Sequence, residues 1–292
     1  MSGAAADGDA SLALFVAERP RLRALAYRML GSLSDADDVV QDAWLRWAAA
    51  DRSGVAAPAG FLTTVTARLA LDRLRAARAS RETYAGPWLP EPVVAAADAD
   101  DGPEGSVPLA LLLLLERLTP EQRAVYVLRE ALELSHAEIA AVLGHSVEAC
   151  RQILRRARDA LGGPPRFVPA QGAAERIAAA FQDACTAGDH SRLAALLAED
   201  AVLLSDGGGI VRTARRPIHG ADRIARLLLG LRRKSGFAPA AQAVRVNGGP
   251  GFLMLLRGRF HGVLAFDADS RGIARLYLVV HPGKLTAVAT QA

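Results

Sequence analysis

The sequence predicts a multidomain chain in which two all-α units are followed by an α+β unit. Apolar residues recur at helical spacing over residues 12–81 and again over 119–161. Between these stretches, residues 85–108 concentrate Pro, Gly and Asp, which favours a poorly structured connection. Strand-like apolar segments bounded by turn residues follow at 252–256, 262–266 and 273–280.

The composition bounds the class of protein. The chain has 292 residues, of which 51% are hydrophobic and 23% charged, so it can bury two or three cores. Cys150 and Cys185 are too few for a disulfide framework or a zinc site, so we expect no metal and no cofactor. The N-terminus lacks the basic start of a secretory signal, and the apolar run at 109–115 is too short to cross a bilayer. We therefore expect a cytoplasmic protein without a membrane partner.

The net charge of +4 is unevenly distributed. Residues 1–85 carry 11 basic and 10 acidic side chains, and residues 115–165 carry seven of each. Residues 86–114 carry five acidic side chains and no basic one, whereas residues 166–292 carry 17 basic and nine acidic ones. An acidic linker therefore precedes a basic C-terminal third.

The clearest motif lies between residues 119 and 161. Thr119-Pro120-Glu121-Gln122 predicts a helix start, and Ser135 with Glu138 forms a second capping box before a helix that ends at Gly144. A short turn then leads into a third helix, 147–161. Two short helices joined by a glycine-containing turn are typical of a helix-turn-helix.

The third of these helices is amphipathic. Its predicted buried face carries Val147, Cys150, Leu154, Ala157 and Leu161. Its exposed face carries Glu148, Arg151, Gln152, Arg155 and Arg158. Arg, Gln and Glu can all hydrogen-bond base edges, so this face suits DNA. The alternative is an ordinary solvated face on a bundle helix.

A second motif spans residues 34–47. Ser34 can cap a helix with an acidic first turn. The polar face of this helix, beside two apolar side chains, suits a basic partner protein. It comprises Asp38, Gln41 and Asp42, next to Val40 and Trp44. The alternative is an unremarkable amphipathic helix.

A third motif spans residues 61–81. Phe61, Val65, Leu69 and Ala76 share one predicted helical face. A second face suits a nucleic-acid backbone, and it carries Thr64, Arg68, Arg75 and Arg78. Leu71 and Leu74 lie on the polar side and indicate burial on more than one side. A solvated face is again the alternative.

Together these three segments resemble extracytoplasmic-function RNA polymerase sigma factors of the sigma-70 family. SLSDADDVVQDAWLRW resembles the helix that binds the clamp helices of the largest polymerase subunit, and PAGFLTTVTARLALDRLR resembles the helix that reads the −10 element. The helix-turn-helix resembles region 4, which reads the −35 element and binds the polymerase flap. The resemblance implies core RNA polymerase and promoter DNA as partners, a protein that is monomeric when free, and no catalytic residues.

The C-terminal third is similar to SnoaL-like domains of the NTF2-like fold, which a sigma-J-like subgroup of these factors carries. The subgroup's motifs correspond to WLPEP in the linker, DGGG in the extension and HPGKL near the C-terminus, where the subgroup has an Asn-Pro-Asp-Lys-Leu type of motif. The resemblance implies interdomain roles for Trp88, Leu89, Pro90, Glu91, Pro92, Asp206, Gly207, Gly208 and Gly209. We expect the DGGG turn to lie close to WLPEP.

The expected domains are region 2 at 10–84, a linker at 85–108, region 4 at 109–163 and the SnoaL-like domain at 168–288. The SnoaL-like domain is expected to modulate the sigma domains in cis and could hold an unidentified small ligand. Two alternatives remain open at this point. One is a stand-alone helix-turn-helix regulator, and the other is a SnoaL-type enzyme with a DNA-binding appendage, for which His219, His261 and Asp267 are candidate acid–base residues.

Overall fold

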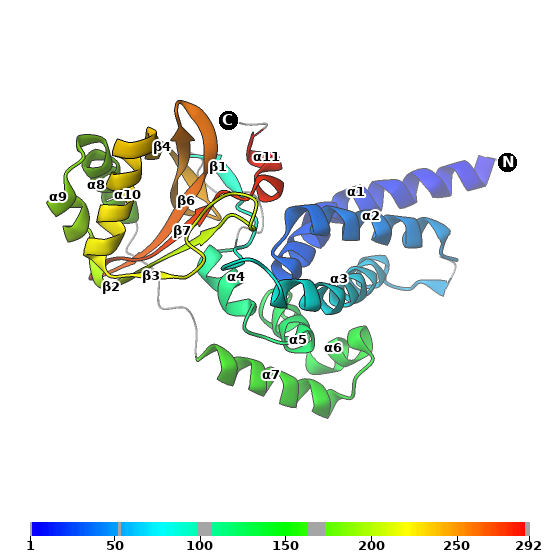
Figure 1. The fold of residues 1–292 in the computed structure, drawn as a ribbon. Coiled ribbons are helices and arrows are strands. Elements are labelled where there is room, and N and C mark those ends of the chain that lie inside the picture. The colour runs from blue at the N-terminus through cyan, green and yellow to red at the C-terminus, as the bar shows by residue number, and fades with distance from the viewer. Residues whose placement is uncertain (1, 52–53, 98–106, 163–172, 290–292) are drawn as a thin grey trace. The chain divides into compact units, whose positions relative to one another are not determined.

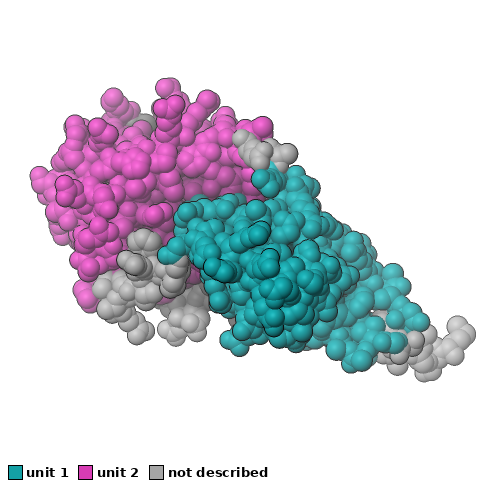
Figure 2. All heavy atoms as spheres, turned by 90° about the horizontal axis from the view of Figure 1, so that it is seen from below, with its two compact units in different colours: residues 1–80, 112–164 teal, residues 81–111, 165–292 magenta. Residues whose placement is uncertain are grey.

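The computed structural model describes residues 2–51, 54–97, 107–162 and 173–289. These residues fall into two compact units, which Figure 2 shows in different colours. Unit 1 comprises residues 1–80 and 112–164, and unit 2 comprises residues 81–111 and 165–292. Residues 163–172, where region 4 is expected to end and the SnoaL-like domain to begin, lie outside the described residues.

Three helices form the first part of unit 1. They are α1 (Ser2–Leu30), α2 (Leu33–Ala49) and α3 (Pro58–Glu82). Their shared core contains Phe15, Leu22, Val40, Trp47 and Leu62. The Trp47 indole also donates a hydrogen bond of 3.3 Å to the Ser11 carbonyl, so its polar edge is satisfied inside the core.

The start of α2 corrects one prediction. Ser34 was expected to cap this helix, but the N-cap is Ser32, whose hydroxyl accepts a hydrogen bond of 3.1 Å from the Asp35 amide. Ser34 lies inside the first turn. Both serines satisfy the local capping preference, and the burial of Leu33 against the neighbouring helices favours the earlier start.

The second part of unit 1 is the helix-turn-helix. It contains α5 (Pro120–Glu130), α6 (His136–Leu143) and α7 (Val147–Leu161), preceded by α4 (Leu109–Leu115). Thr119 and Ser135 each form the predicted capping box. Gly144 ends α6 in the left-handed conformation, with φ of 71°, which glycine adopts without strain.

Unit 2 is built on one seven-stranded sheet with the order β1-β4-β5-β6-β7-β2-β3. The strands are β1 (Val94–Ala96), β2 (Leu197–Asp206), β3 (Ile218–His219), β4 (Phe237–Val246), β5 (Gly249–Leu256), β6 (Arg259–Asp269) and β7 (Gly272–Val279). Figure 1 shows α8 (Ala173–Ala187), α9 (His190–Ala195) and α10 (Ala221–Ser235) on one face of this sheet. A short 3₁₀ turn (Pro282–Lys284) and α11 (Thr286–Ala289) end the described chain.

The core of unit 2 lies between the sheet and the three helices. Phe181 of α8 packs against Phe252 of β5 and Phe266 of β6, with ring centroids 5.7 and 6.0 Å apart. All three rings are buried. The three strand segments predicted from the sequence are confirmed as parts of β5, β6 and β7, and the α+β class of this unit is confirmed with them.

The linker differs from the expectation. Residues 85–97 are not a loose connection, because Val94–Ala96 pairs antiparallel with β4 as an edge strand and Leu89 to Pro92 are buried. The whole described linker belongs to unit 2. Residues 98–106, the most acidic part of the linker, lie outside the described residues. Strands β1 to β4 were not predicted. In β4, alanines and Pro239 give a weak strand signal, which pairing with β5 overrides.

Candidate functional site

The exposed face of α7 matches the sequence prediction. Cys150, Leu154, Ala157 and Leu161 are buried, whereas Val147 lies partly in solvent. The five predicted base-reading side chains are exposed: Glu148, Arg151, Gln152, Arg155 and Arg158. The Arg155 side chain is 86% exposed, and its acidic neighbour Asp159 is 4.0 Å away. Arg158 is held 2.7 Å from Glu130 of α5.

The buried face of α3 is not the predicted one. Leu62, Thr66, Ala70 and Leu74 are buried, along with Leu71. The side chains predicted as the apolar face, Phe61, Val65, Leu69 and Ala76, are half-buried or exposed. The helix has apolar residues on several sides, so its periodicity alone could not select the face that packs against α1 and α2.

Three of the four predicted −10 contacts of α3 are exposed, and Arg68 and Arg75 among them contact α6 and α5 within unit 1. Arg68 donates hydrogen bonds to the carbonyls of Val142 (2.6 Å) and Ala141 (3.1 Å) in α6. Arg75 forms an ion pair with Glu121 of α5 at 3.0 Å. Thr64 is half-buried and donates a hydrogen bond to the Gly60 carbonyl. The helix-turn-helix therefore occupies the cationic face of α3 in this conformation.

The acidic face of α2 is exposed, with one correction. Gln41 and Asp42 lie in solvent, and Asp38 forms an ion pair with Arg73 of α3 at 2.9 Å. Val40 is 3% exposed and belongs to the core, so it supports this face without lying on it. Trp44 is half-buried against Phe15.

Leu45 supplies the exposed apolar side chain of the α2 face instead. It is 57% exposed and lies one helical turn after Gln41. Leu45 was not among the residues predicted for this face. Its position four residues after Gln41 was the available signal.

Asp206, the first residue of the DGGG turn, anchors the linker to the sheet of unit 2. Its carboxylate is buried at 1% exposure and accepts four hydrogen bonds. The donors are the Tyr84 hydroxyl (2.7 Å), the Leu89 amide (2.8 Å), the Lys284 ammonium (2.7 Å) and the Gly208 amide (3.0 Å). The expected proximity of DGGG and WLPEP is therefore present within unit 2.

Lys284 completes this anchor from the HPGKL motif. Its ammonium group donates to the Leu89 carbonyl at 2.6 Å and lies 4.0 Å from the centre of the Trp88 ring. The guanidinium carbon of Arg81 lies 4.1 Å from the same ring centre. Burial lowers the pKa of Lys284, and the Asp206 carboxylate opposes this shift. We use the name linker anchor for Tyr84, Trp88, Leu89, Asp206 and Lys284.

Two other parts of the motifs take part in the packing. Gly208 has a φ of 60°, and a side chain there would collide with the His281 ring. The His281 ring in turn stacks on the Tyr84 ring, with the ring centroids 6.4 Å apart. Neither Tyr84 nor Lys284 was predicted from the sequence to have a role, although Lys284 is the one polar side chain of HPGKL that matches the subgroup's motif. The tertiary contacts were needed to identify both residues.

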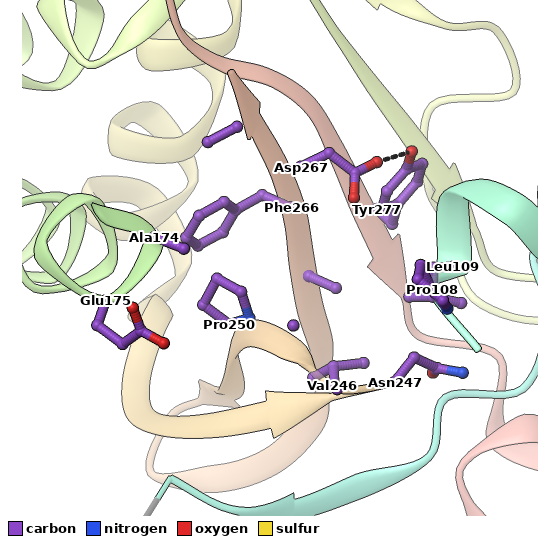
Figure 3. A pocket seen from close by; sticks show the side chains of 14 residues that line it. Pro108, Leu109, Ala174, Glu175, Val246, Asn247, Pro250, Phe266, Asp267 and Tyr277 are labelled. Carbon is purple, nitrogen blue, oxygen red and sulfur yellow. Dashed lines mark hydrogen bonds between the residues drawn. The ribbon is translucent and has the colours of Figure 1, made fainter. Parts of the chain in front are cut away.

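The enzyme alternative has one candidate acid, Asp267. It lines an apolar cavity of about 350 Å³ together with Tyr277, Pro108 and Leu109, and Figure 3 shows the Tyr277 hydroxyl donating to its carboxylate. Burial raises the pKa of Asp267. His219 and His261 are not among the residues that line this cavity, so the three candidates do not converge.

The described residues contain neither a metal site nor a membrane span. No group of three His, Cys, Asp or Glu side chains is placed to hold a metal ion within the described part of the chain. No helix there is both long and apolar enough to span a membrane.

Comparisons with known proteins agree with this geometry. Residues 14–80 match the family model of sigma-70 region 2, and residues 109–161 match that of sigma-70 region 4. The ECF RNA polymerase sigma factor SigJ of Mycobacterium tuberculosis H37Rv is 41% identical over 243 residues, which cover 80% of this chain and 78% of SigJ. The probable ECF sigma factor SigI of M. tuberculosis is 31% identical over 290 residues, 95% of each chain.

A solved structure extends the similarity to the whole fold. The crystal structure of M. tuberculosis SigJ superposes with a TM-score of 0.75 at 34% identity, covering 94% of this chain and 98% of that one. The fold and these matches define a sigma factor of the sigma-70 type, the class of protein that directs RNA polymerase to initiate transcription. The chain belongs to the ECF RNA polymerase sigma factors. Residues 12–81 are therefore not an unrelated helical domain, and the stand-alone regulator alternative is wrong.

Proposed function

We propose that this sigma factor binds core RNA polymerase through the α2 face, reads the −35 element with α7 and the −10 element with α3, and is modulated in cis by its SnoaL-like domain. The linker anchor is the observation that supports the proposed modulation in cis. It ties the segment between regions 2 and 4 to the sheet of unit 2 through Asp206 and Lys284. Any change in this domain thus acts on the segment that sets the spacing of the two DNA-reading regions.

The proposed −10 reading requires a rearrangement. Arg68 and Arg75 are hydrogen-bonded to α6 and α5. Both must leave these partners before they contact DNA. Each of these contacts is made by an exposed side chain and contributes little to stability, so contacts with polymerase and promoter DNA can replace them.

We predict that the α2 face determines the affinity for core polymerase. Asp42→Lys reverses an exposed charge, and Leu45→Ala removes an exposed apolar contact. Each change should weaken core binding on the order of tenfold, because interfaces depend on complementary charge around apolar anchors. Fluorescence anisotropy of the labelled full chain with core polymerase measures this.

The matched control for the α2 face is Glu133→Lys in the turn between α5 and α6, which reverses another exposed carboxylate of the same unit. It should leave core affinity within twofold of the parent. Equal losses for Asp42→Lys and Glu133→Lys would assign the effect to overall charge and reject this face. Asp38 is unsuitable for the test, since its ion pair with Arg73 gives it a structural role.

The modulation is tested by run-off transcription with core polymerase, the full chain and a promoter fragment. Lys284→Met removes the hydrogen bond to the Leu89 carbonyl and the ion pair with Asp206 while keeping a long apolar side chain. We expect transcription to change at least threefold, and the direction identifies the domain as an inhibitor or as a required part. Unchanged transcription, combined with faster protease cleavage of the linker, would show that the SnoaL-like domain has no modulating role.

We further propose that the SnoaL-like domain is not an enzyme. Asp267 has no histidine beside it in the cavity, and its Tyr277 partner has a pKa raised well above the ordinary value by burial and by the Asp267 carboxylate. A phenol in this state is a poor proton donor. We therefore assign the Asp267–Tyr277 hydrogen bond a structural role in the wall of the cavity that Pro108 and Leu109 also line.

A further inference from the structure

The excess of basic side chains is concentrated in the C-terminal third, which contains the SnoaL-like domain, and not in the two regions expected to bind DNA. Residues 1–85 and 115–165 are nearly neutral, whereas residues 166–292 carry eight more basic than acidic side chains. Most acidic groups of this third are already paired. Asp206 pairs with Lys284, Asp183 with Arg192, Asp222 with Arg226, and Asp200 and Asp269 share Arg271.

Three arginines between β2 and β3 remain free. Arg212, Arg215 and Arg216 are exposed, and they have no ion pair or hydrogen bond with any described residue. There is no acidic residue between Asp206 and Asp222. We use the name arginine loop for residues 212–216.

The backbone of the arginine loop is held in place. The amides of Ile210 and Val211 both donate to the Gly207 carbonyl at 3.0 Å, and the Ser205 hydroxyl donates to the Ala214 carbonyl at 2.9 Å. Val211 also packs against the core of unit 2. The loop therefore presents its three guanidinium groups from a fixed base, which lowers the entropic cost of binding a ligand.

The arginine loop lies beside the linker, close to the end of α3. A side chain at Gly86 would lie 3.4 Å from the Arg215 Cα, and Figure 1 shows the loop between β2 and β3 running alongside the linker. Gly86 follows Glu82, the last residue of α3, by four positions. Four residues span at most about 14 Å. Arg215 is therefore held by chain connectivity within roughly 20 Å of the end of α3, whatever the arrangement of the two units.

We propose that the arginine loop is a third DNA-binding element, which contacts promoter phosphates next to the segment bound by α3. Arginine binds phosphate oxygens with two parallel hydrogen bonds, and three free arginines on a fixed loop suit a negatively charged backbone. The position of the site rests on the proposed −10 role of α3. The SnoaL-like domain then acts on the promoter directly as well as through the linker anchor.

The test measures promoter binding by the holoenzyme, assembled from core polymerase and the full chain, as a function of salt. Log affinity falls linearly with log salt, and the steepness of this fall reports the number of phosphate contacts. In Arg212→Gln/Arg215→Gln/Arg216→Gln, the magnitude of the slope should decrease by about 0.9 for each lost contact, roughly 2 to 3 in total. Affinity should drop on the order of tenfold to a hundredfold, equally for promoters of different sequence. Fluorescence anisotropy with a labelled promoter fragment gives both values.

The matched control is Arg223→Gln/Arg233→Gln/Lys234→Gln on α10, which removes the same charge from exposed side chains of the same domain that have no ion pair within the described part of the chain. It should leave the slope unchanged. Equal effects of the two triple variants would show long-range attraction only and overturn the proposal. So would a loss of core affinity without a change in the slope, because the loop would then contact polymerase.

A second variant separates this proposal from the role of α3. Arg78→Gln should change binding if α3 contacts the −10 element. If Arg78→Gln has no effect and the arginine-loop variant lowers the slope, the role of α3 fails and the arginine loop stands as a DNA contact. If Arg78→Gln weakens binding and the arginine-loop variant does not, the arginine-loop proposal fails alone.

Discussion

Asp206→Ala is expected to destabilise unit 2 by about 3 to 5 kcal/mol, because it leaves the buried Lys284 ammonium without its carboxylate partner. The Leu89 amide and the Tyr84 hydroxyl lose their acceptor at the same time. The released linker should then become accessible to protease between Tyr84 and Pro92. Urea unfolding of the full chain and limited proteolysis measure the two effects.

The double variant Asp206→Ala/Lys284→Met distinguishes an unpaired charge from the loss of a stabilising ion pair. Replacing a buried pair by apolar side chains is often nearly neutral, so the double variant should be clearly more stable than Asp206→Ala alone. Asp200→Ala is the matched control on the same strand, because its pair with Arg271 is exposed and should contribute less than about 1 kcal/mol. If the loss of stability in the double variant equals the sum of the losses in the two single variants, this account of the linker anchor is wrong.

Loss of a single base-reading arginine of α7 is expected to have the second largest effect. Arg155→Ala and Arg151→Ala should each cost about 1 to 3 kcal/mol in promoter recognition and relax the preference at one base pair of the −35 element. Both side chains are exposed, and their ion pairs within α7 are long, at 4.0 and 3.3 Å. Run-off transcription on promoters with single substitutions in this element measures the preference.

Arg156→Ala is the matched control for α7. Arg156 is exposed on the same helix, but it lies beside the base-reading face and not on it. Its loss should weaken binding to all promoters alike, as expected for a phosphate contact. If Arg151→Ala and Arg155→Ala transcribe every promoter variant as the parent does, the assignment of α7 is wrong.

Local sequence signals determined the helix-turn-helix almost completely. The capping boxes at Thr119 and Ser135, the glycine at 144 and the amphipathic pattern of residues 147–161 all act within one or two helical turns. Short-range hydrogen bonds and periodicity are visible in the sequence, so the helix bounds and the exposed face of α7 were predictable. The same holds for the three strands with strong apolar content.

The faces of α2 and α3 required the tertiary structure. Both helices carry apolar residues on more than one side, so the packing of the bundle decided that Val40 and Leu71 are buried and that Leu45 and Phe61 are not fully buried. The cap at Ser32 instead of Ser34 follows the burial of Leu33. Such choices depend on which helices meet, and no local pattern contains that information.

The linker anchor shows the limit most clearly. The sequence alone placed WLPEP, DGGG and HPGKL in separate segments, and the resemblance to a family suggested that the first two meet. The four hydrogen bonds to Asp206 join residues up to 122 positions apart. Contacts of this kind depend on how the sheet brings distant segments together, so the roles of Tyr84 and Lys284 were decided by the tertiary structure.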